Sequence, residues 1–163
     1  LMKRAALLTA LVTLPAAALA DSQLERMEAI SEEMNEVMMV MMVNEAAANG
    51  ADPEPLRAAM PDLTWDDAMR EAGSCMLDEY TSEIGSDGVD EMLAKMEEFS
   101  VEMGEMGANG ATMSELGDTS DMLPEGITMQ RSAEITQDCG MMQLQMQRME
   151  ASGFMDAMIK AAQ

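Results

Sequence analysis

The stretch LERMEAISEEMNEVMMVMMV, residues 24–43, decides the fold class of this chain. Its apolar residues recur mostly at steps of three or four, and five glutamates stand among the positions between them. The first members of this series are Leu24, Met27, Ile30, Met34, Met38 and Met41. Such spacing is typical of a helix with one apolar face. We therefore predict a helix over residues 21–49, ended by the pair Asn49-Gly50.

Three further segments show helical spacing, and nothing shows the alternation typical of strands. They are residues 65–84, residues 89–103 and a last stretch that starts near Thr128, with a short terminal piece from Phe154. In the last stretch, Ile135, Cys139, Met142, Met146 and Met149 fall on one predicted inner face. We predict an all-α, Met-rich helical bundle of about four helices, in a single acidic domain over residues 21–163. The Gly-rich segment 104–121 is expected to be flexible.

Residues 2–20, MKRAALLTALVTLPAAALA, have the pattern of a secretory signal peptide. Lys3 and Arg4 precede an apolar run, and small residues surround a cleavage point after Ala20. The apolar run is shorter than the roughly 20 residues that a membrane span needs, which favours a cleaved signal over an anchor. We expect a periplasmic or secreted protein after cleavage near Ala20, with no membrane span in the mature chain.

The net charge of −22, from 31 acidic and 9 basic residues, restricts the choice of partners. A surface this negative repels nucleic acid and anionic lipid, and the four aromatic residues are too few for base stacking. We therefore expect no nucleic-acid partner. The simplest interpretation of this negative charge is that it keeps the protein soluble. The alternatives are a docking surface for a basic partner and a weak cation sink.

Cys75 and Cys139 are the only cysteines, and we predict that they form a disulfide between two helices. Both fall on predicted inner faces, and small neighbours such as Gly73 and Gly140 allow two backbones to come close. Free thiols and metal ligation are the alternatives.

Methionine is the unusual feature of the composition, with 23 residues of 163. The simplest interpretation is that methionine fills the core, where it packs adaptably but specifies packing poorly. As a helix, the densest run is apolar on every side, so it must be enclosed within the chain or meet a partner. The alternative secondary structure for this run is a buried strand. The residues of this run, which we predict to bind a protein partner or form a homo-oligomer, are Val37, Met38, Met39, Val40, Met41, Met42 and Val43.

Methionine thioethers support two alternatives to binding of a protein partner. Soft-metal binding of Cu(I) needs several converging sulfur ligands. The candidate ligands at helical spacing are Met38, Met41, Met42, Met142 and Met146, with Met103 and Met106 as a further pair. An oxidant sink needs exposed methionines that form sulfoxides, for which Met103, Met106 and Met113 are the candidates.

Catalysis is not expected. The chain has no histidine, which excludes histidine-based triads and histidine zinc sites, and it has no Gly-x-x-x-x-Gly-Lys phosphate loop. We therefore predict a non-enzymatic protein with no catalytic residue and no cofactor, apart from Cu(I) in the alternative above.

Overall fold

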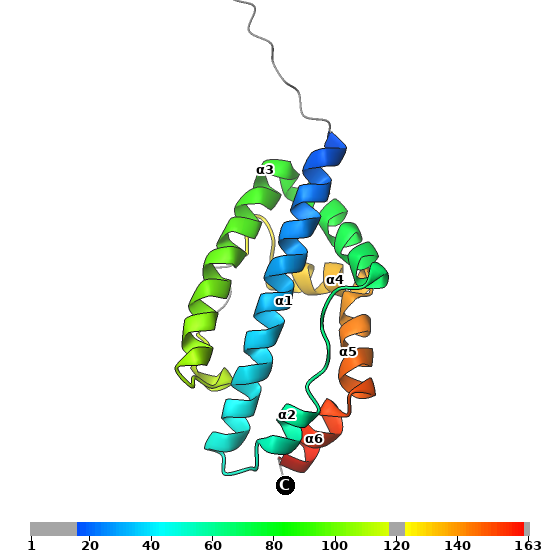
Figure 1. Ribbon diagram of the computed structural model, residues 1–163. Helices are drawn as coiled ribbons and strands as arrows, with labels where there is room; N and C mark the ends of the chain where they lie inside the picture. The colour runs from blue at the N-terminus through cyan, green and yellow to red at the C-terminus, as the bar shows by residue number, and fades with distance from the viewer. Residues whose placement is uncertain (1–15, 118–122, 162–163) are drawn as a thin grey trace, which may run out of the picture.

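The computed structural model describes residues 16–117 and 123–161, and every regular element within them is helical (Figure 1). The elements are α1 (Ala16–Ala48), α2 (Glu54–Ala58), α3 (Asp67–Ala108), the short 3-10 helix η1 (Met113–Glu115), α4 (Met129–Asp138), α5 (Met141–Ala151) and α6 (Phe154–Ala161). A disulfide joins Cys75 to Cys139. The predicted all-α bundle closed by one disulfide is therefore confirmed. Across these described ranges, no helix combines the length and the apolarity that crossing a membrane requires.

The long helix α3 folds back on itself at Gly85, the one residue inside it with non-helical backbone angles (φ 71°, ψ 167°). A positive φ of this kind costs glycine little, because glycine has no Cβ. The first arm of α3 runs antiparallel to α1 and the second arm runs parallel to it (Figure 1). The contacts that give these directions are Trp65 with Glu32 and Arg70 with Glu28 in the first case, and Arg26 with Glu97 and Asn44 with Ala111 in the second. The predicted break between two helices is thus confirmed, although a single residue makes it.

The main core lies between α1, the two arms of α3, α4 and the start of α5. Its buried residues are Met27, Ile30, Trp65, Met69, Ala72, Met76, Leu77, Tyr80, Val89, Met92, Leu93, Ile127, Ile135 and Met141. Five of these are methionines, so thioethers occupy places where leucine or isoleucine is usual. At these positions methionine is a core residue.

A second apolar cluster lies at the end of the molecule away from the bend in α3, where α2 and α6 cover the C-terminal end of α1 (Figure 1). Its buried residues are Met39, Val43, Leu56, Phe154 and Ala157. Phe154 and Leu56 are almost completely enclosed, at 0% and 1% exposed. The last helix of the described chain is therefore held against the first by side-chain packing.

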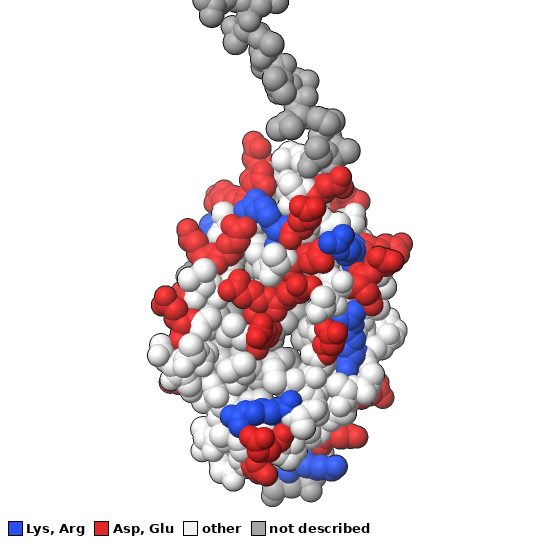
Figure 2. Space-filling view, viewed as in Figure 1, with Lys and Arg blue, Asp and Glu red and all other residues white. Residues whose placement is uncertain are grey.

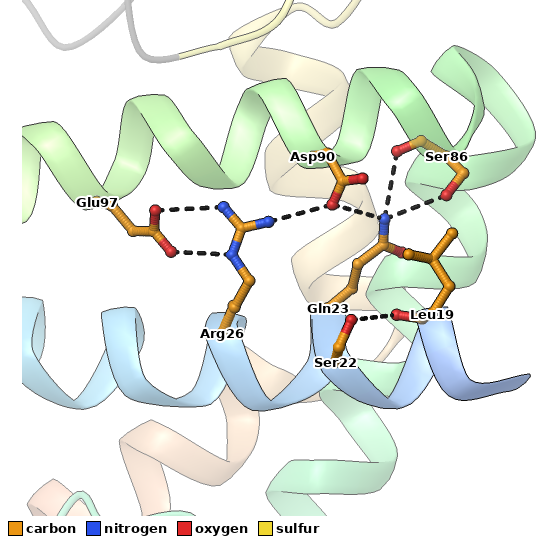
Figure 3. A network of polar contacts seen from close by, with 7 residues as sticks. All are labelled: Leu19, Ser22, Gln23, Arg26, Ser86, Asp90 and Glu97. Atoms are coloured by element: carbon orange, nitrogen blue, oxygen red, sulfur yellow. Dashed lines mark hydrogen bonds and ion pairs between the residues drawn. The ribbon is translucent and has the colours of Figure 1, made fainter. Parts of the chain in front are cut away.

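A polar network joins α1 to the second arm of α3 close to the bend (Figure 3). The Gln23 side chain is 3% exposed, and its Nε2 donates to Asp90 Oδ1 at 3.0 Å and to the Ser86 carbonyl at 3.2 Å. One turn further along α1, the Arg26 guanidinium bridges Asp90 at 3.1 Å and Glu97 at 2.9 Å. Arg26 lowers the pKa of Glu97 by hydrogen bonding and charge. This network fixes the register of the two helices, because Gln23 and Arg26 reach successive turns of α3.

Helix α1 begins at Ala16, before the cleavage point predicted after Ala20. Residues 16–20 are therefore helical and continuous with α1, while residues 1–15 of the predicted signal peptide lie outside the described part of the chain. The signal peptide and its cleavage remain predictions.

The Gly-rich segment 104–121 is more helical than its composition indicates. The second arm of α3 continues through Gly104 to Ala108, instead of ending near Met103. The lack of a side chain at Gly107 lets α3 pack closely against α1, since a Cβ placed there would lie 3.0 Å from Val37 Cγ1. η1 follows, and residues 118–121 lie outside the described ranges. The expected flexibility stays a prediction.

The predicted last helix is divided into α4, α5 and α6. Gly140 and Gly153 stand at the two breaks with positive φ angles of 80° and 78°. The break at Gly153 was expected. The break at Gly140 was not, and it changes which side chains of α5 point inward.

Candidate interaction surface

The run at residues 37–43 is largely covered within the chain itself. Met39, Met41 and Val43 are buried, and Val37, Met38 and Met42 are half-buried. Val40 is the exposed member, at 37%. Val37 and Met41 face Gly107 of α3, whereas Met39 and Val43 join the cluster with α2 and α6. The pattern required this run to be enclosed or to meet a partner, and most of it is covered within the chain. Its predicted role in binding a partner stays a prediction.

Two of the candidate copper ligands in this run, Met41 and Met42, point in different directions. Met41 packs toward Gly107 of α3, while its neighbour Met42 packs against the cluster that contains Phe154. Adjacent helical residues point about 100° apart, so this divergence follows from the helix itself. Met142 and Met146 are exposed on α5, one turn apart.

The methionines proposed as the first targets of oxidants are less accessible than expected. Met103 is 1% exposed, so the prediction that it is readily accessible is wrong. The reason is that α3 continues past Met103 to Ala108, although the Gly-rich composition did not predict a helix there, and Met103 lies on its buried side. Met106 and Met113 are half-buried.

The exposed methionines gather instead on the C-terminal helices. Gly140, with its left-handed backbone, ends α4 and starts α5 in a new phase. As a result Met141 is buried and Leu144 and Met149 pack inward, while Met142 and Met146 point outward at 43% and 56% exposed. The predicted inward stripe that included Met142 and Met146 is therefore wrong.

Helix α6 repeats this arrangement. Phe154 and Ala157 are buried, so Met155, Met158 and Ile159 point to solvent, each between 37% and 57% exposed. We call these three residues together with Met142 and Met146 the outer methionine face. Single exposed apolar residues need no explanation, whereas five on two successive short helices make α5 and α6 the candidate contact surface.

This region differs from the rest of the molecule in charge. Residues 129–161 contain four acidic and three basic residues, whereas the remaining chain contains 27 acidic and six basic residues. Figure 2 shows carboxylates gathered over the part of the visible face formed by α1 and α3. The outer methionine face therefore belongs to the nearly neutral part of a strongly acidic chain.

Two of the three basic residues there hold α4 and α5 against α3. Arg131 pairs with Glu83 at 2.5 Å and with Glu79 at 2.9 Å. Arg148 pairs with Asp66 at 2.7 Å. Asp66 also caps α3, since its carboxylate accepts the Met69 N–H at 2.9 Å. The Met69 hydrogen bond, followed by Arg148, holds the pKa of Asp66 below its ordinary 3.8. These pairs leave Lys160 without an ion pair among the described residues.

The disulfide lies at the surface. Its Cα atoms are 5.7 Å apart, which suits a disulfide, and small residues surround it as predicted. Cys75, however, is exposed, so the prediction that both cysteines lie on inner faces is wrong for this residue. The reason is that α3 meets the corner between α4 and α5 along an open groove of about 490 Å³ that both cysteines line.

A second groove of about 490 Å³ runs between α1 and residues 60–64. Its wall carries the carboxylates of Glu32, Glu33, Glu36 and Asp62. Glu32 and Asp62 already accept the backbone N–H groups of Trp65 and Thr64. Over the described ranges, no three or more aspartate, glutamate, cysteine or histidine side chains are arranged to hold a metal ion.

Comparisons with protein-family models, with curated proteins and with solved structures find no match to this chain. The outer methionine face is thus defined by geometry alone. Sequence reasoning identified four of its five residues as apolar members of helices but assigned Met142 and Met146 to the interior. The signal that could have corrected this was Cys139-Gly140, since glycine is the usual residue just past a helix end.

Proposed function

We propose that this chain is an exported, non-enzymatic binding protein that contacts another protein through the outer methionine face. The observation that carries the proposal is that five apolar side chains are exposed on the successive helices α5 and α6, in the nearly neutral part of an acidic molecule. Unbranched thioethers adapt their shape to varied apolar partners, which suits a surface for protein contact.

Export rests on two features. The first residues have the pattern of a signal peptide, and the disulfide between Cys75 and Cys139 is compatible with an oxidising compartment. A bundle closed in this way presents α5 and α6 on a framework that the disulfide and the Arg131 and Arg148 ion pairs hold against α3.

Site-specific photo-crosslinking in the cells that produce the protein tests the proposal. A photoreactive residue at Met146 or Met158 should give discrete protein adducts on irradiation. Val101 is the matched control, because it is also apolar and 59% exposed but lies on acidic α3. Adducts at all three positions, or at none, would contradict binding through the outer methionine face.

The alternative function is Cu(I) binding. It is favoured by Met142 and Met146, which are exposed one turn apart on the same side of α5. Anaerobic titration of the purified protein should show binding at micromolar Cu(I) or tighter, lost in the double variant Met142→Leu/Met146→Leu. Equal affinity of the two proteins, or no binding, would end this alternative.

A further inference from the structure

We infer that the partner of the outer methionine face is a second copy of this chain, docked with its α6 antiparallel to the α6 of the first. This inference rests on the function proposed above and names its partner. Three features of the described residues carry it: the exposed side of α6, the charges beside it and the charge of the remaining surface.

The exposed side of α6 is apolar along one stripe and charged along one edge. With successive residues about 100° apart, Met158, Met155 and Ile159 fall side by side on the helix. Met158 adjoins buried Phe154, and Met155 and Ile159 lie farther from the buried side. Asp156 and Lys160 follow next around the helix, both exposed, on the same edge of the stripe. Neither forms an ion pair with another described residue.

This pattern complements itself in one orientation. When two helices pack antiparallel about a twofold axis, the same edge of each helix faces its counterpart, and the direction is reversed. Asp156 of each copy then faces Lys160 of the other, twice in each dimer, while the methionine stripes meet between them. Parallel packing places unlike edges together and leaves both charges unpaired.

The rest of the molecule disfavours other contacts between copies. Outside residues 129–161 the chain carries 27 acidic and six basic residues, so most surfaces of two copies repel each other. The region of α4 to α6 is nearly neutral, and two copies can approach there at the smallest electrostatic cost. One eight-residue helix from each copy gives a small central contact. We therefore expect a reversible dimer rather than a permanent one.

Sedimentation equilibrium of the purified protein at about 0.15 M salt tests this inference. The mass of the wild-type protein should rise from monomer toward dimer over roughly 10–500 µM. Asp156→Lys and Lys160→Asp each place like charges opposite one another twice, and each should weaken the dimer about tenfold. Ile159→Glu should weaken it as well, and Val101→Glu, on α3, should not.

The decisive step is to mix the two charge variants. A chain with lysine at both positions faces a chain with aspartate at both, so the mixture should recover the roughly tenfold of affinity that each variant alone lacks. Circular dichroism checks that each variant keeps its helices.

A wild-type protein that is monomeric at all concentrations would overturn the inference, as would a dimer that neither charge variant weakens or a mixture that recovers nothing. A strict monomer that still gives adducts of other masses at Met146 and Met158 would leave the proposed function in place with a different partner. Absence of both dimer and adducts would remove both proposals.

Discussion

At the scale of single residues, Gly73 shows how closely α3 approaches the indole ring of Trp65. A Cβ placed on Gly73 would lie 2.4 Å from Trp65 Cζ3, well inside contact distance. We predict that Gly73→Ala lowers the free energy of unfolding by about 1–2 kcal/mol, because overpacking outweighs the better helix propensity of alanine. Urea unfolding followed by the fluorescence of Trp65, the only tryptophan, measures this directly.

Gly104→Ala is the matched control for this substitution. It makes the same change in the same helix, at a place where, apart from the adjacent residues and the local helix backbone, no atom lies within 4 Å of the new Cβ. It should therefore raise the free energy of unfolding by up to about 1 kcal/mol. Equal effects at the two positions would show that Trp65 does not pack against Gly73 as described.

A second prediction at the scale of single residues concerns the disulfide of Cys75. Since the disulfide lines an open groove and Cys75 is exposed, a small reductant should open it without prior unfolding. Loss of the bond, which closes a separation of 64 residues, should then cost about 4 kcal/mol in the free energy of unfolding. Alkylation followed by mass spectrometry measures the rate of opening, and urea unfolding of the reduced protein measures the cost.

The double variant Cys75→Ser/Cys139→Ser separates this cost from side effects of the reductant, because it should match the reduced wild-type protein. If alkylation begins only when urea unfolds the chain, the groove does not give access to the bond.

At the scale of elements, the network around Gln23 connects α1 to the second arm of α3. Gln23→Glu replaces a buried donor by a carboxylate beside Asp90 and the Ser86 carbonyl. We predict a loss of about 1–3 kcal/mol at pH 7, because two acceptors then face each other with little water. The neighbouring carboxylate and burial both raise the pKa of the new glutamate, so the loss should shrink as the pH falls and this group takes up a proton.

Gln147→Glu is the control, since it adds the same charge at an exposed position of α5. Thermal unfolding of both variants at pH 7 and at about pH 5 compares them. An effect of Gln23→Glu no larger than that of the control would mean that Gln23 does not hold the two helices together.

Some features of the helices could be predicted from the sequence, and others could not. The stripe from Leu24 to Met41 and the disulfide partners were readable, because a helical period and the only two cysteines allow few alternatives. The outer methionine face was not predicted, because Gly140 shifts the helical phase through its left-handed backbone, and a glycine inside a helical pattern does not by itself decide between a helix end and a continued helix. Continuing the helix through Gly140 placed Met142 and Met146 inward.

The run at residues 37–43 illustrates a different limit. Its pattern shows that every side of the helix must be covered, and the covering groups come from distant parts of the chain, Gly107 of α3 on one side and Phe154 of α6 on another. Such long-range packing has no local signature. The sequence therefore predicts that a partner surface is needed and leaves open whether the same chain supplies it.

At the scale of the whole molecule, the distribution of charge links stability to association. Nine ion pairs join described residues, and six of them, made by Arg26, Arg70, Arg131 and Arg148, run between segments distant in the chain. All nine are at least partly exposed, so each contributes little. With 31 acidic residues against nine basic ones, most carboxylates have no basic residue to pair with, and we expect repulsion among them to exceed these attractions. The folded state is compact and carries this repulsion at short range, whereas the unfolded chain relieves it.

Salt should therefore stabilise the protein at neutral pH. Raising sodium chloride from about 0.01 M to about 0.5 M shortens the screening length from roughly 30 Å to a few ångström, which weakens repulsion across the whole surface but affects short ion pairs less. We predict that the melting temperature at pH 7 rises steadily over this range. The same titration near pH 4, where many of the carboxylates are protonated, should give a much smaller rise, which separates screening from general effects of salt on water. A melting temperature that falls with salt at pH 7 would show instead that the ion pairs of Arg26, Arg131 and Arg148 outweigh the repulsion among the carboxylates.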